Sequence, residues 1–349
     1  MQDVIKDNGQ NDRDHGAKSI HEPVLLQEVV DALLRPFGES SSSPQTPQGG
    51  IVEKLSPQAG LKGNYSNPWY LDGTLGGAGH AMAIIKALNG KANLVGLDQD
   101  IRAIDRARTA LQGKLDQSSK LILECENFRN LDKVLEKNGI EKIDMMLLDL
   151  GFSSDELENS GRGFSFQKDE TLEMTMGDPA KHLFTAKDIV NGWTEEDIAN
   201  VIYGYGEERF ARRIARAIVG YRAKKKIETT FELVEIVKMS VPAQKNYSYR
   251  RGKIHPATKT FQALRITVND ELNALKEGLK KGYAALNKGG RMAIISFHSL
   301  EDRIVKDFYK EKAKEGALII TKKPIIASDQ ERMENPRSRS AKLRAIEKN

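Results

Sequence analysis

The chain has 349 residues, of which 39% are hydrophobic, with a single cysteine and a formal net charge of +5. A chain of this length buries a substantial core and is expected to form two domains, or one domain with a large insertion. The lone Cys125 excludes an internal disulfide framework and a multi-cysteine zinc site, and we expect no metal site. No apolar run approaches the roughly 18 residues of a membrane span, and the N-terminus lacks the apolar segment of a signal peptide, so a soluble, cytoplasmic protein is expected.

The beginning of the chain holds one predicted helix between two polar stretches. Residues 1–20 are polar and are expected to be disordered. Residues 21–34 have apolar side chains at helical spacing, with Pro23 at the helix start. The stretch that follows is rich in Ser, Pro and Gly, and we expect residues 38–68 to form a surface insertion loop.

From residue 69 onward, short apolar runs alternate with helical patterns. The predicted strands are 69–71, 94–97, 121–125 and 145–150, and the predicted helices between them are 81–88, 101–111 and 131–138. This alternation is typical of an α/β fold, in which helices cover both faces of a parallel sheet.

The alternation then stops and later resumes. Residues 160–251 contain helical patterns only, over 195–203, 207–225 and 230–239, before a helix over 258–286 and a strand over 291–297 restore the α/β pattern. We therefore predict an all-helical substrate-recognition domain, residues 159–255, inserted between the two parts of one sheet domain, residues 21–158 and 256–349.

A glycine-rich turn, Asp72-Gly-Thr-Leu-Gly-Gly-Ala-Gly-His80, follows the first predicted strand, and the second strand ends in Asp98. Glycines allow a ligand close to the backbone, a helix N-terminus offers free N–H groups, and an acid after the second strand can accept both hydroxyls of a ribose. A dinucleotide fingerprint would need a third glycine where this chain has Met82. S-adenosylmethionine, which has a ribose but no phosphate, is therefore the better candidate ligand.

Other strand ends carry further candidate residues, because ligands of open α/β sheets bind at the carboxyl ends of the strands. Phe128 could pack on an adenine, and Asp149 ends the strand where a cofactor and its substrate would meet. Each acid could instead be an N-cap or turn residue, and His80 could either contact the cofactor or merely begin a helix. Residues 299–302 resemble a capping box, so Ser299 is predicted to begin a helix.

Positive charge is concentrated in residues 203–265, which hold fifteen Lys and Arg against five Glu, so this segment carries +10 and the remainder −5. A solvated helix face is one explanation. A polyanionic partner is the other, since neutralising phosphates releases counterions and drives binding. Tyr247, Tyr249, Arg250 and Arg251 add stacking groups among the cations, which favours nucleic acid.

Eight ordered blocks of the sequence resemble one known family. They are residues 21–26 (HEPVLL), 72–80 (DGTLGGAGH), 147–154 (LLDLGFSS), 162–166 (RGFSF), 205–216 (YGEERFARRIAR), 255–265 (HPATKTFQALR), 295–305 (ISFHSLEDRIV) and 335–340 (NPRSRS). Together they resemble the MraW-type ribosomal RNA methyltransferases, also called the small-subunit methyltransferase H family. The resemblance extends from about residue 21 to residue 348.

This resemblance implies a fold, a reaction and a partner. The fold is a Rossmann-like class I methyltransferase with an inserted helical domain. The reaction is S-adenosylmethionine-dependent methylation of the N4 amine of a cytidine in the decoding (P-site) region of 16S ribosomal RNA. The partner is 16S rRNA or the small ribosomal subunit, bound by a monomer or a homodimer. The family's cofactor contacts correspond to Ala78, Gly79, His80, Asp98, Phe128, Asp149 and Glu156.

Two positions depart from the family pattern. Glu156 stands where the family usually has Gln, which places a carboxylate near a cationic sulfonium. Thr175 stands where the family usually has Arg, so no substrate role of that arginine carries over to this chain.

The expected chemistry points to a proton acceptor. A cytosine amine is a poor nucleophile because its lone pair is delocalised into the ring, so the enzyme must orient it and accept its proton. Asp149 is the candidate acceptor, with Ser153 as a candidate helper; whether Asp149 contacts the amine or the methionine end of the cofactor stays open. The target base must be unpaired or flipped out to be reached.

Other functional classes also remain open. A dinucleotide-dependent oxidoreductase would share the strand–turn–helix opening but lacks the third glycine and leaves the basic segment unexplained. A non-catalytic RNA-binding or assembly protein would explain the cations but not the acids at the strand ends. An enzyme that methylates DNA or another nucleobase is the closest chemical alternative.

Overall fold

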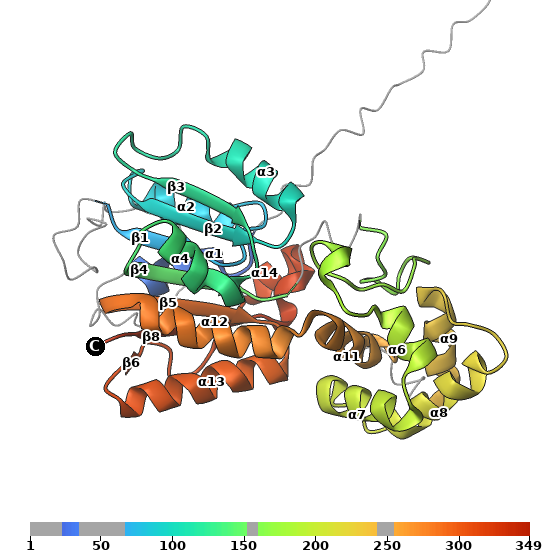
Figure 1. Ribbon diagram of the computed structural model, residues 1–349. Helices are drawn as coiled ribbons and strands as arrows, with labels where there is room; N and C mark the ends of the chain where they lie inside the picture. Colours follow the sequence, from blue (N-terminus) through green and yellow to red (C-terminus); the bar gives the residue numbers. More distant parts are fainter. Residues whose placement is uncertain (1–22, 35–66, 152–159, 243–254) are drawn as a thin grey trace, which may run out of the picture.

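The computed structural model describes residues 23–34, 67–151, 160–242 and 255–349, and it consists of a sheet part beside a helical part (Figure 1). The expectations for residues 1–20 and for most of 38–68 fall outside the described residues. The sheet has eight strands in the order β3-β2-β1-β4-β5-β8-β6, with β7 paired to β8. Among the described residues, no helix is long and apolar enough to cross a membrane.

Five parallel strands form the centre of the sheet and confirm the predicted α/β class. They are β1 (Trp69–Asp72), β2 (Asn93–Asp98), β3 (Leu121–Cys125), β4 (Ile143–Asp149) and β5 (Leu286–Ser296). Every residue of β4 before its last is buried, because helices cover both faces of this strand. A continuous apolar run that ends in an acid is therefore the sequence signature of a central parallel strand here.

Helices cover the two faces of the sheet, as predicted. One face carries α1 (Leu26–Leu34), α2 (Gly79–Ala87) and α3 (Ile101–Leu111), and the other carries α4 (Leu131–Lys137), α12 (Glu271–Ala285) and α13 (Ser299–Lys314). The predicted helix over 21–34 begins later than expected, at Leu26, because the preceding Leu25 has a left-handed backbone with φ of 53°.

The last part of the chain adds an antiparallel edge that the prediction of a purely parallel sheet missed. β8 (Lys342–Glu347) runs antiparallel to β5, and the short β6 (Leu318–Ile319) and β7 (Ile325–Ile326) pair with β8. The buried ion pair between Arg291 and Glu347, at 2.9 Å, fastens β8 to β5. Along the chain, α14 (Asp329–Glu334) and a 3-10 turn, Pro336–Ser340, lie between β7 and β8.

The helical part has a core of its own. Its helices are α6 (Ala186–Gly192), α7 (Glu195–Gly206), α8 (Ala211–Arg222), α9 (Thr230–Ser240) and α11 (Thr258–Asn269). The predicted helix over 207–225 is shorter than expected, since Glu207 has a left-handed backbone that ends α7. Residues 160–185 were predicted to be helical, and this prediction is wrong. They hold a 3-10 turn, Pro179–Lys181, and an isolated bridge between Thr171 and Thr229.

The single helix predicted over 258–286 is wrong, because the chain turns at Asp270. This residue has φ of 49° and separates α11 from α12. An aspartate tolerates the left-handed region better than most residues, and the apolar periodicity continues on both sides of it. Phe261 and Leu264 of α11 belong to the helical core, whereas Leu279 of α12 belongs to the sheet core. The predicted boundary between the helical domain and the sheet domain, at residues 255 and 256, stays a prediction. The packing of the two helices favours a boundary nearer to Asp270.

Candidate active site

The glycine-rich turn after β1 is tied to the strands on both sides of it. The N–H of Gly73 donates to the carbonyl oxygen of Leu147 in β4 at 3.0 Å, and the N–H of Gly76 donates to Oδ2 of Asp98 at the end of β2 at 2.8 Å. Gly76 has φ of 51°, which glycine adopts without strain. The turn therefore brings the carboxyl ends of β1, β2 and β4 to one place.

The start of α2 presents backbone rather than side chains. Ala78 is the N-cap, with φ of 62°, and its side chain makes no capping hydrogen bond. A Cβ on Gly79 would lie 2.3 Å from Cγ of Pro23, so only glycine fits under the segment that leads into α1. The first N–H groups of a helix have no intrahelical partner, so this end can donate to a ligand.

Asp98 is held in place by two backbone donors. Its Oδ2 accepts from Gly76, and its Oδ1 accepts from the N–H of Asp100 at 2.9 Å. Burial raises the pKa of Asp98. Each carboxylate oxygen can accept a second hydrogen bond, so Asp98 retains acceptors for a ribose.

A segment of the helical part closes over the ends of β2 and β3. The cavity there is about 70 Å³, and its lining comprises Gln99, Cys125, Glu126, Asn127, Met176, Gly177, Asp178, Lys181 and His182. Gly177 has φ of +66°, and a Cβ at this residue would lie 2.7 Å from the carbonyl oxygen of Gln99. Arg162 fixes the segment by donating to the carbonyls of Thr175 and Gly177, each at 2.7 Å.

Phe128 follows β3 beside this cavity. It begins a 3-10 turn, Phe128–Asn130, and its ring packs against Gly278 of α12, where a Cβ would lie 2.6 Å from the ring. The ring is therefore fixed at the edge where an adenine is expected, and its contact with the adenine stays a prediction.

Asp149 is the last residue of β4 and keeps one oxygen for a ligand. Its N–H donates to Oγ1 of Thr74 at 2.6 Å, and its Oδ2 lies 3.8 Å from Nδ1 of His80. Its Oδ1 is buried and has no hydrogen-bond partner among the described residues. Burial, together with the negative charge of Glu301, raises the pKa of Asp149 to about 7. A buried acceptor without a partner is costly, so this atom is suited to a donor on a bound ligand.

Asp72 and His80 lie deeper, behind Asp149. Asp72 accepts from the hydroxyl of Tyr70 at 3.0 Å and from the N–H of Thr74 at 3.1 Å, and burial raises its pKa to about 6. The Nε2 of His80 lies 2.9 Å from the carbonyl oxygen of Val24, and burial lowers the pKa of the ring. The His80 side chain is thus packed inside the first turn of α2, and its contact with the cofactor stays a prediction.

A second buried cluster lies at the end of β5. Ligand atoms of Glu271, His298 and Glu301 lie within 4.8 Å of one another, but both oxygens of Glu271 already accept from Arg265 at 2.9 Å. Nδ1 of His298 accepts from the N–H of Glu301, so Nε2 of the neutral ring carries the hydrogen and offers no lone pair to a metal. The donor set fits an ion-pair cluster better than a metal. Ser299 is the first residue of α13 as predicted, but the capping box over 299–302 is misplaced by one residue, because His298 is the N-cap and pairs with Glu301.

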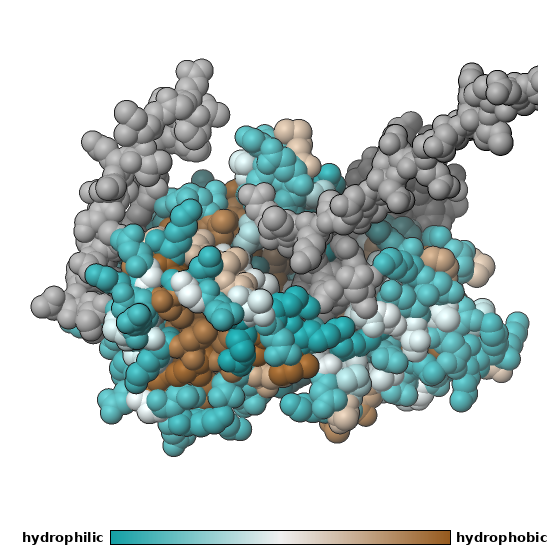
Figure 2. Space-filling model, turned by 90° about the horizontal axis from the view of Figure 1, so that it is seen from above, coloured by the Kyte–Doolittle hydropathy of each residue, from teal (hydrophilic) through white to brown (hydrophobic). Residues whose placement is uncertain are grey.

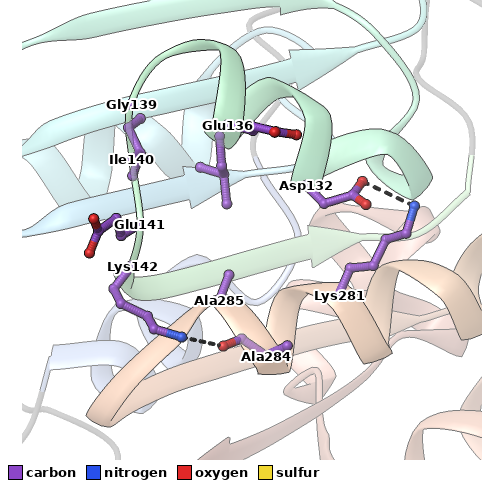
Figure 3. Close-up of a pocket in the computed structure, with 10 residues that line it drawn as sticks. Asp132, Glu136, Gly139, Ile140, Glu141, Lys142, Lys281, Ala284 and Ala285 are labelled. Atoms are coloured by element: carbon purple, nitrogen blue, oxygen red, sulfur yellow. Dashed lines mark hydrogen bonds and ion pairs between the residues drawn. The ribbon is translucent and has the colours of Figure 1, made fainter.

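The larger cavity lies elsewhere, between α4 and α12 (Figure 3). It measures about 540 Å³, and the ion pair between Lys281 and Asp132, at 3.0 Å, lies at its side. Residues 139–142 of its lining precede β4, at the amino end of the strand. Ligands of open α/β sheets bind at the opposite end, so this cavity is not the candidate active site.

Some of the predicted site residues lie together in the structure. The structure brings Ala78, Gly79, His80, Asp98 and Asp149 together around the turn, while Ser153 and Glu156 lie outside the described residues. So do Tyr247, Tyr249, Arg250 and Arg251. Three residues of the site were not predicted from the sequence: Tyr70, Thr74 and Glu301. The Asp-Gly-Thr order of the turn was a visible signal for Thr74, and the capping box at the start of α13 was one for Glu301.

The strand order, the glycine turn after β1 and the acids after β2 and β4 define a class of protein, the Rossmann-like class I methyltransferases that use S-adenosylmethionine. The model of the MraW methylase family matches residues 18–349, and the chain belongs to this family. S-adenosylmethionine as the cofactor is therefore confirmed.

Known relatives cover most of the chain. A protein of Deinococcus deserti is 46% identical over 305 residues, which is 85% of this chain and 90% of the relative. One of Acetivibrio thermocellus is 46% identical over 345 residues, or 94% and 98% of the two chains. Both are named ribosomal RNA small subunit methyltransferase H. The structure of Aeropyrum pernix fibrillarin with bound S-adenosylmethionine matches 80% of this chain and 66% of its own, at 9% identity and a TM-score of 0.34.

Proposed function

We propose that this protein methylates the N4 amine of a cytidine in the decoding (P-site) region of 16S ribosomal RNA. The observation that carries the proposal is Oδ1 of Asp149, a buried acceptor without a partner among the described residues, at the strand end where a cofactor and a substrate meet. The name shared by the relatives supports the RNA of the small subunit as the substrate. The resemblance of the sequence blocks supplies the base and its position.

The cofactor would lie across the turn after β1. The backbone of Ala78 and Gly79 would donate to its methionine end, Asp98 would accept its ribose hydroxyls, and Phe128 would pack on its adenine. Glu156 is another proposed cofactor contact. When bound, S-adenosylmethionine supplies an electrophilic methyl group: the lone pair of the amine forms the new N–C bond, and the electron pair of the broken C–S bond stays on sulfur.

Asp149 would orient the amine and take its proton at Oδ1. Because the lone pair of a cytosine amine is delocalised, alignment and proton removal are the two contributions that the protein must make, and a positioned base typically contributes about a hundred- to ten-thousandfold. The hydrogen bond from the backbone of Asp149 to Thr74 fixes the carboxyl group for this task. Ser153 is proposed as a helper of Asp149.

The helical part would hold the RNA. Exposed cations on α8 and just before it follow a spacing of three and four residues, which places them on one helix face; they are Arg209, Arg212, Arg213 and Arg216. Tyr203 of α7 is 68% exposed and could stack on an unpaired base. Seen from above, the helical part has a mostly hydrophilic surface (Figure 2).

The chain just before this cationic face contacts the sheet part. Glu207, between α7 and α8, hydrogen-bonds to Ser299 and, at 3.0 Å, to Arg303 at the start of α13. Since α13 follows β5, RNA bound on α8 would lie close to the carboxyl edge of the sheet.

Mapping the methylated nucleotide tests the proposal. Small subunits from cells that lack the protein should carry an unmodified cytidine in the decoding region, and the wild-type gene should restore N4-methylcytidine there. Methyl transfer to another base or to DNA would replace the proposed substrate, and intact modification in the deletion strain would refute the proposal. Offering purified enzyme naked 16S rRNA and assembled subunits in parallel identifies the form that it accepts, and sedimentation of the enzyme decides between monomer and homodimer.

A further inference from the structure

Three ionisable side chains meet at the turn after β1, and the proposed function uses only one of them. Asp72, His80 and Asp149 come from β1, α2 and β4. Asp72 is 2% exposed and His80 is 7% exposed, so neither presents much side chain to solvent. Their hydrogen bonds determine which atoms already carry hydrogen.

The tautomer of His80 follows from its contact with Val24. A carbonyl oxygen only accepts, so Nε2 of His80, at 2.9 Å from this oxygen, carries the hydrogen. In the neutral ring, Nδ1 then holds a lone pair, and it lies 3.8 Å from Oδ2 of Asp149. A lone pair that faces a carboxylate oxygen is favourable only when a proton lies between the two atoms.

We propose that His80 is the second proton acceptor of the reaction and receives, through Asp149, the proton that the substrate amine loses. The inference rests on the proposed function. It begins from the form in which Oδ2 of Asp149 carries a hydrogen. The amine hydrogen moves to Oδ1 as the hydrogen on Oδ2 moves to Nδ1 of His80, so Asp149 stays neutral and His80 becomes an imidazolium.

The transfer requires Oδ2 and Nδ1 to approach by about 1 Å, since a hydrogen bond needs a separation near 2.8 Å. Rotation of the carboxyl group of Asp149 about its Cβ–Cγ bond provides this approach, because that torsion is soft. Catalytic hydrogen bonds that are long in a free enzyme commonly shorten when the substrate is bound.

The surrounding charges favour this direction of transfer. The negative charge of Asp72 acts on His80 and would stabilise an imidazolium, while the hydroxyl of Tyr70 and the N–H of Thr74 hold the Asp72 carboxylate. Glu301 of α13 acts on Asp149 and favours its protonated form. Burial raises the pKa of Asp149 and lowers that of His80, so a protonated carboxyl group and a bare Nδ1 coexist near neutral pH.

The first test observes His80 without any turnover. Nitrogen NMR of histidine-labelled enzyme, with the resonances assigned by their absence in His80→Gln, should find Nε2 protonated from about pH 5 to pH 8. Nδ1 should gain its proton as the pH falls, at a pH that changes in Asp149→Asn. A neutral His80 with its hydrogen on Nδ1, or a titration that Asp149→Asn leaves unchanged, would overturn the proposal whether or not the enzyme methylates RNA.

The second test compares pH profiles. Glutamine at position 80 keeps a donor for Val24 but cannot take up a proton. About one-tenth of Asp149 is ionised at pH 6, so the loss of kcat in His80→Gln should be about tenfold larger at pH 6 than at pH 8. Any change in affinity for S-adenosylhomocysteine should be the same at pH 6 and at pH 8.

Two results would contradict the relay. Superimposable pH profiles of His80→Gln and the wild type would show that no proton passes through His80. An equal loss of turnover and of S-adenosylhomocysteine binding at every pH would make His80 a cofactor ligand instead. Product mapping with the wild-type enzyme reports on the proposed function separately, since the relay would serve any amine at this position.

Discussion

The two parts of the molecule place charge in opposite surroundings. At the edge of the sheet, Asp72 is buried and Asp98 is partly buried; both accept hydrogen bonds from the backbone, and desolvation raises their pKa values. On α8, Arg212 and Arg213 are exposed and pair with no acid among the described residues. Burial shifts the pH at which an acid gains or loses its proton, whereas an exposed cation attracts a polyanion over about a Debye length. We therefore propose proton handling for the sheet part and RNA binding for the helical part.

The largest expected effect comes from the sheet part. Asp149→Asn keeps the shape of the side chain but removes the proton acceptor, so kcat should fall about a hundred- to ten-thousandfold. Asp144→Asn is the matched control: this acid lies in the same strand, 3% exposed, and accepts from the N–H of Trp69 and the side chain of Asn287. It should lower stability but leave the kcat of the folded enzyme close to wild type. Full turnover in Asp149→Asn, measured as labelled methyl transfer, would refute the proposed role of Asp149.

The same substitution should change how stability depends on pH. The folded-state pKa of Asp149, about 7, exceeds its ordinary value of 3.8. A raised pKa favours the protonated folded state, so this contribution is complete below about pH 4 and is lost as the pH rises through 7. Its full size would be about 4 kcal/mol, but the side chain is 27% exposed and solvent screens part of it, so about 1–3 kcal/mol is expected.

Asparagine at position 149 has no proton to lose. The difference in free energy of unfolding between Asp149→Asn and wild type, both free of cofactor, should therefore be about 1–3 kcal/mol more favourable to the variant at pH 8 than at pH 4.5. Chemical unfolding of both proteins at the two pH values measures this difference. An equal difference at both pH values would mean that Asp149 is ionised in the folded protein throughout.

The sequence identified the edge of the sheet better than it identified the contacts behind it. Asp98 and Asp149 were predictable because each ends a buried apolar run, and such runs place their last residues at one edge of a parallel sheet. The contact between His80 and Val24 joins residues 56 positions apart and depends on the left-handed turn at Leu25. No local pattern encodes a contact of that kind.

The helical part was predictable in its composition but not in its boundary. Apolar spacing indicated most of its helices, and the excess of Lys and Arg favoured a nucleic-acid partner, which stays a prediction. The turn at Asp270 was missed because apolar periodicity is unbroken across it, so only the tertiary packing of α11 and α12 against different cores reveals the break. The alternation of polar and apolar residues over 342–345 could have indicated the start of β8, although it gives no partner strand.

A moderate effect is expected in the helical part. Charge reversal of Arg212 and Arg213 together should weaken RNA binding at least tenfold at low salt and reduce the slope of log affinity against log salt by about 1–2, since each lost phosphate contact accounts for about 0.7. Lys322→Glu with Lys323→Glu is the control, because it changes the net charge equally at exposed positions of the sheet part. Equal slopes for the two double variants would mean that total charge, rather than the α8 face, governs RNA binding.

The smallest effect is expected where the two parts meet. Glu207→Gln keeps a polar group near Ser299 but removes the charge that pairs with Arg303, and both partners of that ion pair are substantially exposed. Exposed ion pairs contribute about 0–1 kcal/mol, so the free energy of unfolding should fall by less than about 1 kcal/mol. Glu207→Gly should recover part of this loss, because the residue has φ of 48° and glycine adopts that conformation without strain. If Glu207→Gln lowers kcat for RNA strongly while the protein stays folded, then the corner between α7 and α8 positions RNA against the sheet edge. RNA binding by the helical part and proton transfer in the sheet part would then be coupled through this junction.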